Sequence, residues 1–306
     1  MRNLATSSLV LFAALAAFGP GAFAQQPPRP GIDKPGLEVP VITPGPGWKT
    51  CPRCKNEARA AADREQAKVD TRQFDKHDIT GVWSGTPMNL DDNGSTFDVS
   101  KLPSFTPYGQ KLYDATLSDS PEWSSKDPMN ICDPLGYPRS FAYNYGIEFA
   151  KLPGRLVEFF EWGHYWRDIW TDGRKLPPNP PIPRFYGYAV GRWEGDTFVV
   201  ESNGYDDRSW IVADNSRRNP QKRVGGFPHS DEMQIREEYK RVNYGLLQVT
   251  ITITDPKVYA APWSTTDVIA LNPNSEIAEH LCVTSDAISY NDQNNLPALS
   301  GAQKQK

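Results

Sequence analysis

Residues 233–254 read MQIREEYKRVNYGLLQVTITIT, and this stretch decides the fold. Along residues 233–242 one alternate set is almost wholly charged or polar, so it faces water and the other set faces inward. The run after residues 243–245 alternates Leu, Val and Ile with Gln and Thr, which predicts a partner strand across a tight turn. The inward set of the first strand is Met233, Ile235, Glu237, Tyr239 and Arg241. The carboxylate of Glu237 is therefore expected to point into an apolar interior.

Similar runs predict further strands along the chain. Residues 156–160 and 165–170 are expected to form one hairpin, and residues 186–193 and 197–202 another. Strands joined mostly by short turns predict a mainly β protein, an antiparallel meander that closes into a barrel. A two-sheet β-sandwich is the alternative, and the lack of long helical patterns between strands argues against a doubly wound fold. Shorter strands are expected at 79–84, 268–271 and 281–284.

Two stretches between the expected strands, residues 101–145 and 203–228, show no regular pattern. Irregular segments of this length in a compact domain are usually lids or mouth loops. We expect them to border a binding site.

The N-terminal segment predicts export. Residues 1–24 combine a positive start, a short apolar run and Ala22-Phe23-Ala24, which is typical of a signal peptide cleaved after Ala24. The apolar run is too short for a membrane span. The mature chain is therefore expected in the periplasm or outside the cell.

The remaining organisation follows from composition. Residues 25–54 are rich in Pro and Gly and predict a tether, and residues 55–77 hold a short exposed helix over the Ala- and charge-rich 55–69. The barrel domain is expected at 78–290 and a disordered tail at 291–306.

Four cysteines in an exported chain favour disulfides. The even count permits three pairings, and the sequence does not choose among them. Our hypothesis pairs Cys51 with Cys54 in the tether, and Cys132 with Cys282.

Charge and motifs argue against several function classes. The chain has 33 Lys and Arg against 37 Asp and Glu, a net charge of −4, and the signs are mixed, whereas nucleic-acid binders show a basic patch. The four histidines are scattered without a zinc-binding spacing, so no metal site is expected. No Gly-rich phosphate loop is present, and no cofactor is expected. The oligomeric state stays open.

Two stretches resemble known families. Gly81-Val82-Trp83 resembles the Gly-x-Trp opening of lipocalin-type barrels, in which the Trp closes one end of the barrel. Residues 191–200, GRWEGDTFVV, are similar to a hairpin in a group of uncharacterised exported bacterial proteins. Their match spans roughly residues 78–285 and implies a lipocalin-like barrel and export, but no reaction. The match continues through Pro228-His229-Ser230-Asp231, Asp255-Pro256-Lys257 and Pro262-Trp263. It differs at two positions, where Phe198 replaces the usual Leu and Glu201 the expected Asp.

The candidate catalytic residues are His229, Asp231 and Glu237. His229 follows a long loop and precedes the strand of Glu237, so an imidazole and an inward carboxylate are expected near one rim of the barrel. Such a pair could divide base and acid roles in an elimination, hydration or isomerisation. The alternative is that His229 caps a turn and Glu237 pairs with a buried Arg167 or Arg139. A serine hydrolase triad is not indicated, since no Gly-x-Ser-x-Gly elbow occurs.

The candidate ligand-binding residues are aromatic and basic. In the run of residues 164–170, Tyr165 and Arg167 share one face while Trp170 lies on the other. Aromatic faces could stack on a flat apolar ligand, and an Arg could hold an anionic group. Cross-strand packing within the sheet is the alternative. The expected ligand contacts are Arg139, Tyr165, Arg167, Trp170 and Tyr239.

Three functions therefore stay in contention. The favoured one is binding of a small, partly apolar or aromatic molecule in the barrel cavity. A cofactor-free lyase, hydratase or isomerase is the enzyme alternative, and whether the protein is an enzyme stays open. The third is a surface or envelope interaction module that works through the Pro-rich tether.

Overall fold

The computed structural model describes residues 67–84, 103–118, 126–143, 145–214, 225–273 and 276–290. The expected signal peptide, the tether with Cys51 and Cys54, and the C-terminal tail lie outside these residues. Of the expected helix in 55–77, only residues 67 and 68 are described as helical.

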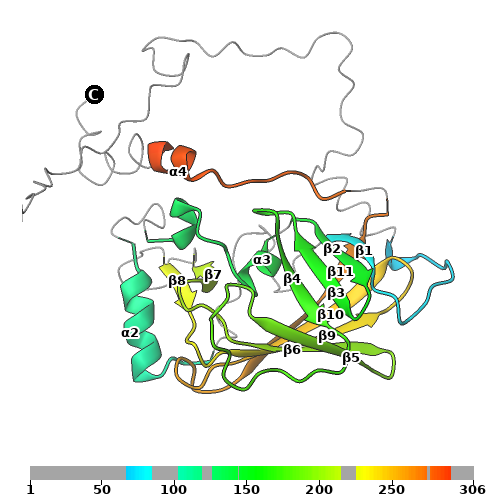
Figure 1. Cartoon of the computed structure of the whole chain (residues 1–306), viewed down its shortest axis with the longest axis horizontal. Coiled ribbons are helices and arrows are strands. Elements are labelled where there is room, and N and C mark those ends of the chain that lie inside the picture. The colour runs from blue at the N-terminus through cyan, green and yellow to red at the C-terminus, as the bar shows by residue number, and fades with distance from the viewer. Residues whose placement is uncertain are drawn as a thin grey trace, which may run out of the picture. The chain divides into compact units, whose positions relative to one another are not determined.

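Nine strands within the described residues close into one barrel, in the order β1-β11-β10-β9-β6-β5-β4-β3-β2 (Figure 1). The fold is a mainly β, lipocalin-like barrel, as predicted, and the sandwich alternative is wrong. The strands are β1 (Gly81–Ser84), β2 (Ile147–Leu152), β3 (Arg155–Phe160), β4 (Tyr165–Trp170), β5 (Tyr188–Glu194), β6 (Thr197–Asn203), β9 (Gln234–Arg241), β10 (Leu246–Thr254) and β11 (Trp263–Leu271).

The predicted hairpins β3–β4, β5–β6 and β9–β10 are confirmed, but the meander is not purely antiparallel. β4 and β5 pair in parallel through Ile169↔Ala189 and Trp170↔Val190. A parallel neighbour requires the chain to return to the end where β4 began, and residues 171–187 make that crossing. Their sequence, TDGRKLPPNPPIPRFYG, is rich in Pro, which cannot donate to a sheet.

Two other expectations need correction. The expected strand at 281–284 does not form, because Leu281 to Val283 are irregular and Thr284 begins the helix α4 (Thr284–Tyr290). The stretches 101–145 and 203–228 are also more regular than expected. Their described parts hold α2 (Pro107–Thr116), the 3-10 helix η2 (Pro128–Ile131), α3 (Arg139–Ala142), β7 (Trp210–Asp214) and β8 (Gly225–Pro228).

β7 and β8 form a separate two-stranded sheet, and α2 packs against it beside the barrel (Figure 1). The Thr106 side chain caps α2 by accepting from the Gly109 N–H at 3.0 Å. Thr116, at the other end of the helix, accepts from the Gly226 N–H of β8 at 3.0 Å. Four aromatic rings pack together at this interface, those of Phe105, Tyr113, Phe227 and Tyr259.

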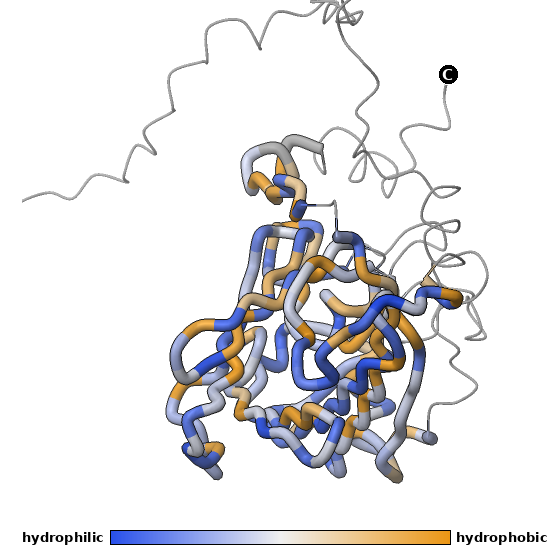
Figure 2. The backbone as a smooth tube through the Cα atoms, turned by 90° about the vertical axis from the view of Figure 1, so that its right-hand side faces the viewer, coloured by the Kyte–Doolittle hydropathy of each residue, from blue (hydrophilic) through white to orange (hydrophobic). Residues whose placement is uncertain are grey.

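The alternation predicted for β9 is observed. Ile235, Glu237 and Tyr239 are at most 2% exposed, while the residues between them reach solvent. Figure 2 shows hydrophobic and hydrophilic residues interspersed along the described backbone. Where β9 turns into β10, the Arg241 guanidinium lies 5.0 Å from the ring of the fully buried Trp83 and fills that end of the barrel.

Candidate functional site

The barrel interior contains a buried ion-pair cluster that joins three strands. β3, β4 and β9 contribute Glu158, Arg167 and Glu237, all at most 3% exposed. The Arg167 Nε donates to Glu158 Oε2 at 2.5 Å, and its two terminal nitrogens donate to the Glu237 oxygens at 3.0 and 2.5 Å. Such a bidentate geometry is the strongest form of an Arg–carboxylate contact.

Two tyrosines complete the shell of Glu237. Tyr137 OH and Tyr239 OH donate to its Oε2 at 2.7 and 2.5 Å, and the Tyr137 ring lies 3.7 Å from the Arg167 guanidinium. Both oxygens of Glu237 are therefore occupied by groups of the protein itself. Glu237 points inward as predicted and pairs with Arg167, which was the structural alternative.

The cluster carries more negative than positive charge. Two carboxylates face one guanidinium, and burial, reinforced by the Glu237 charge and opposed by Arg167, raises the pKa of Glu158 to about 7. Burial lowers the pKa of Arg167, but the two carboxylates outweigh it and raise that pKa well above its usual value. Among the described residues, Glu158 Oε1 has no hydrogen-bond partner.

His229 belongs to a different cluster, beside β7. Its Nε2 lies 2.9 Å from Ser209 Oγ and its Nδ1 lies 3.1 Å from the Ser230 carbonyl oxygen. A carbonyl only accepts, so Nδ1 carries the proton, and in a neutral ring Nε2 accepts from Ser209. Burial lowers the pKa of His229, which favours that neutral form.

The three candidate catalytic residues are therefore not brought together. No hydrogen bond joins His229 to Glu237, although both lie in the described part of the chain and both are buried. Asp231 is exposed and pairs with Lys257 at 2.8 Å. The residue that contacts His229 instead is Ser209, which was not predicted because the sequence carries no clear signal for the β7–β8 sheet that brings the two together.

The candidate ligand-binding residues also lie in different environments. Arg139 is buried and pairs with Asp127 through two contacts of 2.7 and 2.5 Å, so its charge is already balanced. Tyr239 belongs to the buried cluster around Glu237. Trp170 lies on the outer face, with the Arg174 guanidinium 3.6 Å from its ring. Of the predicted set, Tyr165 is half-buried on the inner face of β4.

Half-buried rings gather where β3 turns into β4. We define the aromatic mouth as Tyr145, Trp162, Tyr165 and His280. The His280 ring lies 4.2 Å from Trp162 and 5.1 Å from Tyr145, and Trp162 lies 5.1 Å from Tyr145. Tyr165 joins them through Gly163, against which its ring packs closely. Of these four residues, only Tyr165 was among the predicted ligand contacts.

Rings also connect the mouth to the buried cluster. Tyr165 contacts Tyr186 at 5.6 Å, Tyr186 stacks on Phe160 at 5.2 Å, and Phe160 lies 6.2 Å from Tyr137. Tyr137 in turn contacts both Arg167 and Glu237. We call these four rings the ring ladder, because they run from the half-exposed end of the barrel to its charged centre.

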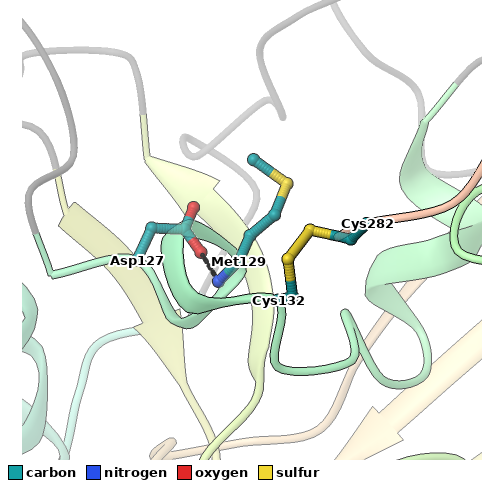
Figure 3. The surroundings of a disulfide bond; sticks show 4 residues. All are labelled: Asp127, Met129, Cys132 and Cys282. Carbon is teal, nitrogen blue, oxygen red and sulfur yellow. Dashed lines mark hydrogen bonds between the residues drawn. A yellow bond between two sulfur atoms is a disulfide. The ribbon is translucent and has the colours of Figure 1, made fainter. Parts of the chain in front are cut away.

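The C-terminal arm, residues 276–290, is held by a disulfide to the segment after η2 and by a backbone hydrogen bond at the mouth. Cys282 is bonded to Cys132, which follows η2, and Asp127 caps η2 through the Met129 N–H at 2.9 Å (Figure 3). This confirms the predicted Cys132–Cys282 pairing. The His280 carbonyl accepts from the Gly163 N–H at 2.7 Å, which fixes the arm beside Trp162.

The comparisons with known proteins do not identify the chain. No family model, curated protein or solved structure matches it. The residues described here contain no cluster of three or more His, Cys, Asp or Glu side chains suited to a metal ion. Within the same ranges, every helix is too short or too polar to span a lipid bilayer.

Proposed function

We propose that the protein is exported and binds a small, partly aromatic molecule at the aromatic mouth of its barrel. The observation that carries the proposal is the group of half-buried rings Tyr145, Trp162, Tyr165 and His280 at one end of an otherwise well-buried core. Large rings left partly open to water at one place favour stacking with a flat apolar molecule.

The mouth suits this role better than the centre of the barrel. Around Glu237 the protein's own Tyr137, Arg167 and Tyr239 occupy the space and the hydrogen-bonding positions. Ligand pockets combine apolar walls with a few polar groups. The ring ladder leads from the mouth to polar groups of this kind, which surround Glu237.

Binding is tested by replacing one ring at the mouth and one ring outside it. Trp162→Ala removes a ring of the mouth, whereas Trp166→Ala removes a ring of the same kind that is 60% exposed on the outer face of β4. The protein is purified from periplasm, and native mass spectrometry detects compounds that it retains. Trp162→Ala is expected to lose the retained compound and Trp166→Ala to keep it. Equal retention by both variants, or a wild-type protein that carries nothing and binds no aromatic probe in calorimetry, contradicts the proposal.

Export is supported by the disulfide between Cys132 and Cys282, since such bonds persist in oxidising compartments. The resemblance to lipocalin-type barrels and to exported bacterial proteins points the same way. N-terminal sequencing of the mature protein is expected to begin at Gln25, and a mature chain that still begins at Met1 contradicts the proposed signal peptide.

A further inference from the structure

In the barrel cluster, Glu158 is the carboxylate with a hydrogen bond to only one of its two oxygens. Its Oε2 accepts from Arg167 at 2.5 Å, and its Oε1 is buried without any partner in the described part of the chain. Buried polar atoms in folded proteins are nearly always paired, so an isolated carboxylate oxygen requires an explanation.

Protonation does not remove the mismatch. Because Oε2 is engaged by Arg167, a proton on Glu158 resides on Oε1 and turns that atom into a donor without an acceptor. In the ionised form the same atom is an acceptor without a donor. Only a further group, brought in from outside the cluster, satisfies Oε1, and for the ionised form that group must be a donor.

The charges around Glu158 select the kind of donor. Arg167 faces Glu158 and Glu237 together, so the cluster has one negative charge in excess when Glu158 is ionised. The other buried guanidinium of this region, Arg139, is neutralised by Asp127. An anionic ligand would therefore meet no unbalanced positive charge at the barrel centre, whereas a cation would balance the excess carboxylate.

We propose that the molecule bound at the aromatic mouth carries a primary amine, and that its ammonium group donates to Glu158 Oε1. This proposal rests on the proposed function and names the ligand class for the same site. The rings of the ladder, Tyr165, Tyr186, Phe160 and Tyr137, lie packed between the half-exposed mouth and the charged cluster, and the ammonium group has to pass them. The ladder is closed in this structure, so binding requires these rings to rotate, and the affinity is reduced by the fraction of time the route is closed.

The test compares three probes that share a phenyl ring and differ in their polar group: 2-phenylethylamine, 2-phenylethanol and phenylacetate. Each is titrated into the full mature protein by calorimetry at pH 8. The wild type is expected to bind the amine most tightly and phenylacetate least. Glu158→Gln is expected to lower the affinity for the amine by about tenfold or more, because the amide at this position carries no charge. The affinity for the alcohol is expected to stay nearly unchanged.

Glu148→Gln is the matched control. Glu148 lies on the outer face of β2, opposite Phe159, so its substitution makes the same change in net charge without touching the interior. An amine affinity that falls equally in both variants indicates a long-range charge effect and overturns the proposal. So does an amine that binds Glu158→Gln as well as it binds the wild type.

A pH series on the wild type provides a second measurement that needs no variant. From pH 5.5 to 8, amine binding is expected to strengthen relative to binding of the alcohol as Glu158 ionises. The charged and titratable groups facing Glu158 are Arg167, Glu237, Tyr137, Tyr239, Tyr186 and Tyr205, and the mouth adds His280, Glu161 and Asp133. Dividing the amine affinity by the alcohol affinity removes effects that the mouth groups exert on any aromatic probe. A flat ratio overturns the proposal.

Failure of this inference is separable from failure of the proposed function. If Trp162→Ala abolishes alcohol binding but the amine shows no preference, the mouth binds ligands and only the amine assignment falls. If none of the probes binds, native mass spectrometry decides. A retained compound with an amine supports the assignment, a retained compound without one overturns it, and no retained compound overturns both proposals.

Discussion

At the scale of single residues, Glu158 makes the stability of the protein depend on pH. Its pKa is raised from the ordinary 4.5 to about 7 in the folded state, so between these values the folded protein holds a proton that the unfolded chain releases. The stabilisation is complete below pH 4.5 and is lost as the pH rises through 7. Glu158→Gln removes this dependence, so its free energy of unfolding, measured relative to that of the wild type, is expected to rise by roughly 3 kcal/mol between pH 4.5 and pH 8.

Urea unfolding of the wild type and Glu158→Gln at several pH values measures the difference. The comparison uses the difference between the two proteins, since other groups titrate in both. A difference that does not change between pH 4.5 and 8 would contradict the buried, proton-holding state of Glu158.

His229 acts in the opposite direction. Burial lowers its pKa below the ordinary 6.5, so on acidification the unfolded chain takes up a proton before the folded protein does. Its contribution is present above pH 6.5 and is lost as the pH falls through the folded pKa. His229→Gln is expected to lower stability at pH 7.5 by about 1–3 kcal/mol, because the Ser230 carbonyl loses the imidazole N–H and Ser209 keeps only the Asp206 carbonyl as a partner. Its deficit should shrink as the pH falls below 6.5, as measured by thermal unfolding, and a deficit that grows on acidification would indicate a charged His229.

Residue roles were predictable where the sequence alternates cleanly. The inward direction of Glu237 followed from the charged set on the other face of residues 233–242, and its Arg167 partner was among the alternatives. Glu158 was not predictable, because the run RLVEFF does not alternate and both Leu156 and Val157 are buried beside it. Ser209 and Trp162 acquire their neighbours only through tertiary contacts.

At the scale of secondary-structure elements, Gly109 determines how α2 docks. In an isolated helix, Gly→Ala is favourable by about 1 kcal/mol. Here a Cβ on Gly109 would lie 2.1 Å from the Val258 carbonyl oxygen, which belongs to backbone and cannot move aside as a side chain does. Gly109→Ala is therefore expected to destabilise the protein, by about 2 kcal/mol or more.

Lys111→Ala is the control for Gly109→Ala, since Lys111 is exposed on the same helix. Thermal unfolding should show a lower melting temperature for Gly109→Ala and little change for the control. If both variants gain stability, helix propensity dominates and the close contact with Val258 is not essential.

The strands were more predictable than the helices, because a strand with one buried face alternates apolar and polar residues in the sequence. The start of α2 also has a signal, a capping Thr106 followed by Pro107, which a search for helix starts could have found. The parallel β4–β5 pairing has no local signal in the sequence, since it depends on the path that residues 171–187 take from the end of β4 to the start of β5. The expected strand at 281–284 was wrong because a short apolar run fits an exposed arm equally well.

At the scale of the whole molecule, the Cys132–Cys282 bond joins residues 150 positions apart and so constrains nearly the entire barrel. Cys282→Ser is expected to lower the free energy of unfolding by about 2–4 kcal/mol and to loosen the C-terminal arm. Limited proteolysis with mass spectrometry should then find cuts within residues 276–290. Leu281→Ser, an exposed neighbour, is the control, and equal cleavage of both variants would show that the bond does not hold the arm.

Closure of the barrel depends on its shortest strand. β1 has four residues, yet Gly81 to Trp83 pair with Phe149 to Ile147 on one side, and Trp83 and Ser84 pair with Leu271 and Ala270 on the other. Without β1, the strands β2 and β11 would each present a row of unpaired backbone groups to the solvent, and such rows template pairing between chains. Four residues near the start of the fold thus separate a closed sheet from one with two edges open to other chains.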